Sequence, residues 1–153
     1  MERTEYISKD PSETIDIGEM IGRSAVAGEV YAIYGDLGAG KTRLVKGIAR
    51  GIGVPDWEYV VSPSFTLMNV YEGAMTLCHV DLYRLEETDL ADLNIEEFLS
   101  GGIVAVEWAE RSRWWEGVIE VRIEISGEME RKIVIIKQER PGEQRLKPGP
   151  NDP

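Results

Sequence analysis

The sequence is poor in cysteine and has no long apolar run. Its 153 residues include one cysteine, Cys78, so no disulfide can form within the chain. A single cysteine is typical of proteins from reducing compartments. No apolar stretch approaches the ~18–20 residues that span a bilayer, and residues 1–5 carry charges where a secretory signal is apolar. We therefore expect a cytoplasmic protein without a membrane segment.

Basic residues are also scarce. The chain has 17 lysine and arginine residues against 28 aspartate and glutamate residues, which gives a net charge of -11. Such a chain repels a phosphate backbone at long range, and this argues against broad nucleic-acid binding by the protein alone. If its function involves RNA, we expect a basic partner to make most of the contact.

The length fits one domain, because domains usually contain ~100–200 residues. A chain of this size buries enough surface to form a core without a metal or a disulfide. From residue 138 to residue 153 the sequence is charged, rich in Pro and Gly, and without apolar periodicity. We expect a single domain over residues 1–137 and a disordered tail over 138–153.

Hydrophobic patterns predict several strands. The apolar run Val30–Tyr34 lies between glycines and is typical of a buried parallel strand, and Ile103–Val106 is typical of a central strand. Other segments have the alternation or β-branched content of hairpins and of a short N-terminal strand. These segments are 1–11, 60–71 paired with 75–83, and 118–125 paired with 132–137.

Helices are predicted over 12–26, 41–50 and 86–99, from apolar spacing and from the glycines that follow each segment. Ser12 and Thr14 are the candidate caps of the first helix. Strands that alternate with helices, with hairpins inserted, predict an α/β fold. We expect three layers, in which helices cover both faces of a mixed parallel and antiparallel sheet.

A phosphate-binding loop (P-loop) lies between the strand at 30–34 and the helix at 41–50. Gly35–Thr42 reads Gly-Asp-Leu-Gly-Ala-Gly-Lys-Thr and matches G-x-x-x-x-G-K-[ST] at every invariant position. The glycines let backbone N–H groups turn toward an anion, and the helix N-terminus adds partial positive charge. Lys41 is placed to reach the β- and γ-phosphates, and the Thr42 hydroxyl to ligate Mg²⁺. The loop predicts a nucleoside triphosphate with Mg²⁺ as the ligand.

A P-loop also needs a carboxylate at the end of a nearby strand, which holds Mg²⁺ or its water. Glu107 directly follows the predicted central strand, and Glu110 and Asp81 are alternatives. Asp81 shares a strand face with His79 and Tyr83, where it either polarises water or makes structural hydrogen bonds. We assign no metal to His79, because it has no partner at metal-ligand spacing.

Three further features have two interpretations each. Ser62–Thr66 is rich in hydroxyls and is either a segment that senses the γ-phosphate or a plain turn. Arg43, Lys46 and Arg50 form a basic stripe, which is either solvated surface or a docking site. Trp108 belongs either to the rim of the site or to the core.

The motifs leave three classes of P-loop protein open. Asn-Lys-x-Asp and Asp-x-x-Gly, expected in regulatory GTPases, do not occur, and this absence favours ATP over GTP. The chain is then an ATPase, a small-molecule kinase with Arg111 and Arg113 as candidates for a lid, or a regulatory module that holds nucleotide without turnover.

Four motifs together resemble the bacterial TsaE family, formerly called YjeE. They are Gly35–Thr42, Ser62–Thr66 with Tyr71, His79–Arg84 and Val106–Trp108. Their order and spacing match that family over residues 7–136, nearly the whole folded part. Four motifs in register make this resemblance much more specific than the P-loop alone.

The resemblance implies a small cytoplasmic ATPase with a P-loop NTPase-like fold. That family is needed to make threonylcarbamoyladenosine beside the anticodon of tRNAs that read codons starting with A. Its members bind a complex of TsaD, the transferase, with TsaB, and their ATP cycle resets this complex between turnovers. The resemblance thus implies ATP and Mg²⁺ as cofactors, TsaD and TsaB as partners, and tRNA only as an indirect one.

By the same resemblance, residues take on roles motif by motif. Thr42 and Glu107 bind Mg²⁺, Asp81 is needed for hydrolysis, and Ser62–Thr66 responds to the nucleotide. The predicted catalytic residues are Lys41, Asp81 and Glu107. The residues implied to bind the nucleotide are Asp36, Leu37, Gly38, Ala39, Gly40, Lys41 and Thr42 at the phosphates, with Thr14 and a late hairpin containing Gly127 and Arg131 closing over the base.

Two positions depart from the family pattern. Ser64 stands where the family usually has Thr, and the hydroxyl is kept. Asn94 precedes Ile95 where the family often has Gly, and Asn tolerates a left-handed backbone, so the turn is expected to persist.

Two expectations concern the chemistry. No arginine finger is evident in cis, and such a residue contributes ~10³–10⁵ in rate, so we expect hydrolysis to be weak without a partner. We also expect Lys41 to be exposed at its loop, so that its replacement removes nucleotide binding without unfolding the chain.

We predict that the isolated chain binds tRNA weakly, because its net charge of -11 repels phosphate. A filter-binding titration at low and at moderate salt measures this. Tight binding that weakens steeply with salt would contradict the prediction.

Overall fold

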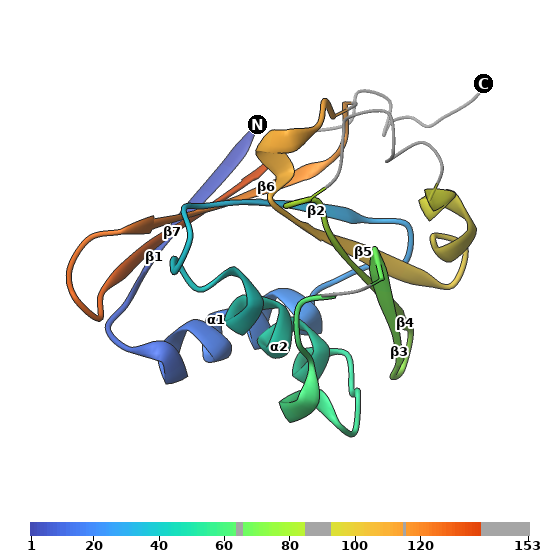
Figure 1. Cartoon of the computed structure of the whole chain (residues 1–153), viewed down its shortest axis with the longest axis horizontal. Coiled ribbons are helices and arrows are strands. Elements are labelled where there is room, and N and C mark those ends of the chain that lie inside the picture. Colours follow the sequence, from blue (N-terminus) through green and yellow to red (C-terminus); the bar gives the residue numbers. More distant parts are fainter. Residues whose placement is uncertain (64–65, 85–92, 115, 139–153) are drawn as a thin grey trace.

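The computed structural model describes residues 1–63, 66–84, 93–114 and 116–138, and it is built on a seven-stranded sheet (Figure 1). The strands lie in the order β1-β7-β6-β2-β5-β4-β3. Their bounds are Glu2–Ser8 (β1), Val30–Tyr34 (β2), Met68–Glu72 (β3), Thr76–Asp81 (β4), Gly102–Glu107 (β5), Ile119–Ile125 (β6) and Arg131–Lys137 (β7). β2 runs parallel to β5 and β6, and β4 runs parallel to β5, whereas the outer pairs are antiparallel. The predicted α/β class with a mixed sheet is confirmed.

Two α-helices, α1 (Pro11–Arg23) and α2 (Lys41–Gly51), lie on the same face of the sheet (Figure 1). Asp10 caps α1, because its Oδ1 accepts a hydrogen bond from the Glu13 N–H at 2.9 Å. The predicted caps, Ser12 and Thr14, are wrong, since Pro11 takes the first helical position and puts the cap one residue earlier. No helix within the described residues is long and apolar enough to cross a membrane.

The two α-helices touch backbone to backbone at glycines. A Cβ on Gly47 would lie 2.1 Å from the carbonyl oxygen of Ile15, and a Cβ on Gly18 would lie 2.3 Å from that of Leu44. Residues without a side chain are therefore required at this contact. The four glycines concerned are Gly18 and Gly22 of α1 and Gly47 and Gly51 of α2.

The central strands are buried on both faces. Tyr31 and Ile33 of β2 pack with α1 and α2, whereas Val30 and Ala32 pack with apolar residues of the opposite face. That face carries two short 3₁₀ helices, η3 (Ile95–Phe98) and η4 (Ala109–Arg111). Within the described residues, both α-helices therefore cover one face of the sheet, and η3 and η4 cover the other.

The predicted helix over 86–99 lies partly outside the described residues, which omit 85–92. Within the described part, η3 is preceded by Asn94, whose left-handed φ of 51° matches the expectation for that position. The predicted tail falls outside the described residues from 139 onward.

The segment after α2 differs from the prediction of a strand beginning at residue 60. A 3₁₀ helix, η1 (Trp57–Tyr59), lies just before this segment, residues 60–63 are in no strand, and β3 spans Met68–Glu72. Lys46 Nζ donates to the Glu58 carbonyl at 2.6 Å, and Val60 is fully buried in the core beside α2. These contacts hold the segment against α2, and they override the β-propensity of its apolar residues.

Cys78 lies on β4 and is 0% exposed. Its Sγ is 3.5 Å from Met68 Sδ on the neighbouring strand. Burial raises the pKa of the thiol to about 12. The thiol is therefore a packing group of the core and not a reactive one.

We predict that Gly47→Ala lowers the free energy of unfolding by about 2 kcal/mol or more, because the added methyl group overlaps the Ile15 carbonyl and separates the helices. The accompanying gain in helix propensity is at most about 1 kcal/mol. Urea denaturation followed by circular dichroism measures the difference. Gly101→Ala is the matched control, since a Cβ there meets no atom of the described residues within 4 Å. Equal stability of the two variants would contradict the close helix contact.

Candidate nucleotide-binding site

The loop between β2 and α2 has the backbone conformation of an anion cradle. Gly38 and Gly40 have positive φ angles of 82° and 107°, which glycine adopts without strain. Gly40 is the N-cap of α2 and has no side chain to bond the first turn. The first N–H groups of α2 are therefore left for another acceptor, such as a phosphate.

Lys41 is packed against the loop. It is 5% exposed, and its Nζ donates to the carbonyl oxygens of Gly35 at 2.6 Å and Asp36 at 3.0 Å. The ammonium also lies 3.9 Å from the centroid of the Trp108 ring, a cation–π contact. Burial lowers the pKa of Lys41, and the charge of Glu107 opposes this. The expectation that Lys41 is exposed is wrong, because the ring covers the side chain and the loop carbonyls bind its end.

Glu107 ends β5 as a buried carboxylate that is 2% exposed. Thr42 Oγ1 donates to its Oε2 at 2.9 Å, and His79 Nε2 lies 2.6 Å from the same oxygen. Ser62 Oγ is 3.3 Å from Glu107 Oε2 and 2.6 Å from Thr42 Oγ1. The carboxylate therefore joins α2, β4 and the segment that follows η1.

The contacts of His79 and Ser62 were not predicted from the sequence. The strand pattern puts His79 on the face that carries Asp81, but the partner on β5 depends on the register of two strands. Ser62 belongs to a segment noted for its hydroxyls, which is the only signal the sequence offers for its contact with Thr42.

Asp81 ends β4 and lies beside Glu107 in the parallel register of β4 and β5. Its Oδ1 accepts a hydrogen bond from the Tyr83 N–H at 2.8 Å. Burial raises the pKa of the Asp81 carboxyl, and the nearby charge of Glu107 raises it further. A carboxyl group of this kind beside a cavity is a candidate proton acceptor.

Trp108 directly follows Glu107 and has a left-handed backbone with φ 59° and ψ 43°. This conformation costs a residue with a side chain about 1–2 kcal/mol, so the surrounding contacts must maintain it. The indole ring packs on Tyr83 with ring centroids 4.9 Å apart, and Lys41 lies over it. Trp108 therefore lines the rim of the site and is also packed, partly buried, against the core.

These side chains line one cavity of about 400 Å³. It lies at the carboxyl ends of the parallel strands, where α/β sheets commonly bind ligands. The lining residues are Leu37, Gly38, Gly40, Lys41, Thr42, Arg43, Ser62, Asp81, Tyr83, Glu107 and Trp108.

Five residues assigned to the nucleotide by resemblance are not in the lining of this cavity, namely Thr14, Asp36, Ala39, Gly127 and Arg131. Asp36 is exposed on the loop, the Ala39 side chain is buried, and Thr14 is buried in the first part of α1. Arg131 contacts the loop backbone: its Nε donates to the Ala39 carbonyl at 3.0 Å and its Nη2 to the Gly38 carbonyl at 3.2 Å. Arg131 thus supports the loop, and base contact by Thr14 or Arg131 stays a prediction.

The oxygen donors of the cavity fit a metal ion that arrives with phosphate. Among the described residues, no group of three or more His, Cys, Asp and Glu side chains is arranged to hold a metal. Thr42 and Glu107 are nevertheless side by side. Mg²⁺ is usually bound by one or two protein oxygens together with phosphate oxygens and water, and this pair meets that requirement.

The basic stripe on α2 mainly serves the fold. Arg50 Nη2 pairs with Asp16 at 2.7 Å and Glu19 at 2.8 Å, both on α1. Lys46 bonds to the backbone beside η1. Arg43 is exposed and lines the edge of the cavity.

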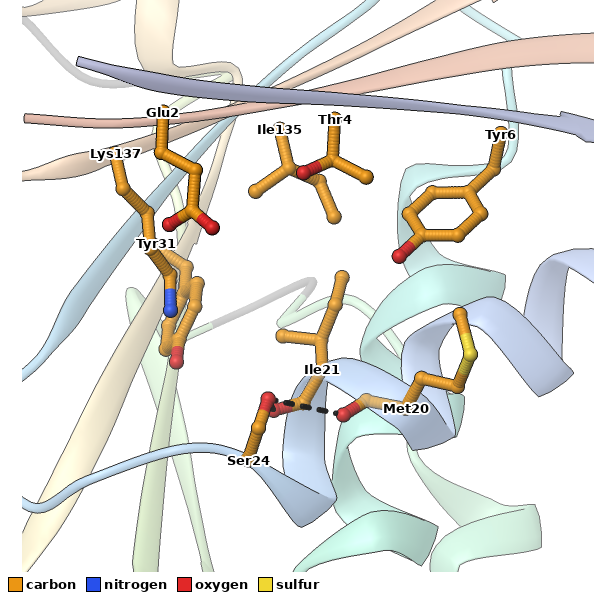
Figure 2. Close-up of a pocket in the computed structure, with 9 residues that line it drawn as sticks. All are labelled: Glu2, Thr4, Tyr6, Met20, Ile21, Ser24, Tyr31, Ile135 and Lys137. Carbon is orange, nitrogen blue, oxygen red and sulfur yellow. Dashed lines mark hydrogen bonds between the residues drawn. The ribbon is translucent and has the colours of Figure 1, made fainter.

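A second cavity, of about 120 Å³, lies between β1, β7 and α1 (Figure 2). Its lining includes Glu2 and Lys137, which are opposite each other in the β1–β7 register. The hydroxyl of Tyr31, also in the lining, already donates to Glu29 at 2.5 Å. Among the described residues, none lines both this cavity and the P-loop cavity, and we assign this cavity no role.

Comparisons with known proteins point to one family. The family described as "Threonylcarbamoyl adenosine biosynthesis protein TsaE" matches residues 8–133. A Nostoc protein named tRNA threonylcarbamoyladenosine biosynthesis protein TsaE is 45% identical, over 71% of this chain and 69% of its own. A protein of the same name from Aquifex aeolicus is 38% identical, over 88% of this chain and 96% of its own. The crystal structure of Bacillus subtilis YdiB is similar with a TM-score of 0.69 and 30% identity, over 89% of this chain and 86% of that one.

We predict that Arg131→Ala lowers the free energy of unfolding by about 2 kcal/mol, because charge-assisted hydrogen bonds to the loop carbonyls of Gly38 and Ala39 are lost. Arg122→Ala is the matched control on the same hairpin, because Arg122 is exposed and its side chain stacks on Tyr34 and pairs with the half-exposed Glu120. Arg122→Ala should lower the free energy of unfolding by about 1 kcal/mol or less. Urea denaturation measures both, and equal losses would contradict a supporting role for Arg131.

Proposed function

The chain belongs to the TsaE family of threonylcarbamoyladenosine biosynthesis proteins, and from this membership we propose that it is an ATPase required for that tRNA modification. In this proposal it binds ATP with Mg²⁺ at the P-loop, hydrolyses ATP weakly alone, and acts in the cytoplasm on the complex of TsaD with TsaB. The tRNA is then reached only through these partners.

The observation that supports this proposal most strongly is that the P-loop and the ends of β4 and β5 line the same cavity. Lys41 and Thr42 begin α2, and Glu107 and Asp81 end the adjacent strands β5 and β4. The site thereby contains a cation for phosphate, a hydroxyl for Mg²⁺ and two carboxylates of different environment. These are the groups that phosphoryl transfer from a nucleotide requires.

The loop fits a chain of phosphates. The positive φ of Gly38 and Gly40 supports the turn, and the first N–H groups of α2 lack a cap. We propose that Lys41 exchanges its two loop carbonyls for phosphate oxygens, which carry full charge and are stronger acceptors of an ammonium. This exchange also withdraws the ammonium from the Trp108 ring.

We propose that the side chains of Thr42 and Glu107 would hold Mg²⁺. A bound Mg²⁺ would neutralise charge that develops on the β- and γ-phosphate oxygens. Thr42 Oγ1 would be a direct ligand, with its proton donated to Glu107 as in the 2.9 Å bond of this structure. Glu107 would also accept hydrogen bonds from water on the metal.

Asp81 is the proposed proton acceptor for hydrolysis. Its carboxyl lines the cavity, and burial raises its pKa above the ordinary value for aspartate. A stronger base takes the proton of water more readily as the water attacks phosphorus. The attack breaks the bond to the leaving ADP and yields inorganic phosphate.

Dependence on a partner is supported by the open side of the cavity. Leu37 is 78% and Tyr83 45% exposed, although both are apolar and line the cavity. A protein that covered them would exclude water and supply further charge to the phosphates. Among the described lining residues the one arginine is Arg43, at the start of α2.

We predict that ATP turnover with Mg²⁺ is slow for the chain alone and rises about tenfold or more when TsaD and TsaB are both added. Phosphate release, measured with a coupled assay, should be lost in Lys41→Ala and in Glu107→Ala. Lys9→Ala and Glu96→Ala replace exposed residues of the same types outside the cavity and should retain it. Melting curves check that each variant is folded, since Lys41 and Glu107 are both buried.

Other outcomes would favour the alternatives. Transfer of labelled phosphate to a small acceptor rather than to water would indicate a kinase. Nucleotide binding without phosphate release, alone or with partners, would indicate a regulatory module. Rates that stay the same on mixing would reject activation by TsaD and TsaB.

A further inference from the structure

His79 is a buried polar side chain to which the proposed chemistry assigns no task. It is the only histidine of the chain, and it is 0% exposed. On β4 it lies between Asn69 of β3 and Ala105 of β5. Its Nε2 is 2.6 Å from Glu107 Oε2, whereas Nδ1 has no hydrogen-bond partner within the part of the chain that the structure describes.

This pattern determines which ring nitrogen donates. A carboxylate oxygen accepts hydrogen bonds and cannot donate them, so Nε2 carries the proton. With the proton on Nδ1 instead, a nitrogen lone pair would face the Glu107 oxygen and a buried N–H would have no acceptor. The ring therefore presents its Nε2–H to Glu107, and the side without a partner is an unprotonated nitrogen.

The same bond restricts the carboxylate. Oε2 lies 2.6 Å from His79 Nε2, and Thr42 Oγ1 faces both carboxylate oxygens, at 2.9 Å from Oε2 and 3.1 Å from Oε1. The imidazole is a stiff ring inside the core, whereas a glutamate side chain has three rotatable bonds. His79 can thus hold Glu107 in one orientation from the core side, while Thr42 and Ser62 contact the same carboxylate from the cavity side.

We propose that His79 is a positioning residue: its Nε2–H holds the Glu107 carboxylate against Thr42 and thereby sets how tightly the site binds Mg²⁺ together with a nucleotide. The metal part of this inference rests on the proposed function, whereas the hydrogen bond does not. Hydrogen bonds of this outer kind typically change metal affinity by about 10–100-fold.

The hydrogen bond is tested by nitrogen NMR of the full chain labelled at histidine. Because the chain has one histidine, a single imidazole spectrum is expected, with the proton on Nε2 and slow exchange of that proton with water. Glu107→Gln should change the chemical shift of this Nε2 proton, because an amide oxygen is a weaker hydrogen-bond acceptor than a carboxylate. A proton on Nδ1, or an Nε2 proton that exchanges as in free imidazole, would overturn the inference.

The effect on the metal is tested with His79→Leu and His79→Gln. Calorimetry measures ADP binding at increasing Mg²⁺ and without Mg²⁺. We expect His79→Leu to raise the half-saturating Mg²⁺ concentration about tenfold and to leave metal-free ADP affinity within about twofold. His79→Gln keeps an N–H of similar reach and should recover part of the loss. Leu77→Val is the control, since Leu77 is equally buried on the same strand face and has no polar group.

The outcomes separate the two proposals. A native chain that binds no nucleotide overturns the proposed function, while the NMR result still decides the hydrogen bond. A native chain that binds Mg²⁺ with ADP, and whose His79 variants bind it equally well, overturns the positioning role alone. If His79→Leu does not fold, His79→Gln and the NMR measurement decide it.

Discussion

A carboxylate buried at the end of the central strand is the constraint on which the site depends. Glu107 is 2% exposed, and a charge is tolerated in such a place only when hydrogen-bond donors surround it. Its partners come from three separate segments: Thr42 begins α2, Ser62 follows η1, and His79 lies within β4. The chain satisfies this carboxylate only when those segments have come together. Folding of the sheet and assembly of the cavity are therefore linked through one side chain.

The loop that faces this carboxylate is supported from the rest of the fold. The glycine contact between α1 and α2 brings Thr14 beside the loop, where its Cγ2 would lie 3.8 Å from a Cβ at Gly40. Arg131, on β7, bonds the loop carbonyls from the hairpin β6–β7. Two elements distant in sequence thus limit its motion. A loop with a defined backbone binds an anion at a smaller entropic cost.

Sequence patterns predicted the features that are determined by residues close together in the chain, namely the buried strands and the P-loop. Val30–Tyr34 and Ile103–Val106 were recognisable because burial on both faces leaves an unbroken apolar run, and Gly35–Thr42 because its backbone demands glycines. The predicted strand that is wrong at residues 60–63 shows the limit, since contacts with α2 override the local preference of this segment. The bond of His79 to Glu107 depends on strand register, and that of Arg131 to Gly38 joins residues 93 positions apart. The left-handed backbone of Trp108 also arises from tertiary contacts, because nothing in its residue type favours it.

The burial of Cys78 has a practical consequence for spectroscopy. With the thiol at 0% exposure and its pKa raised to about 12, maleimide dyes and spin labels will not attach to the native chain at neutral pH. A cysteine introduced at an exposed site can therefore be labelled selectively in the wild-type background. Distances between such a probe and a labelled partner then become measurable without altering the core that Cys78 helps to fill.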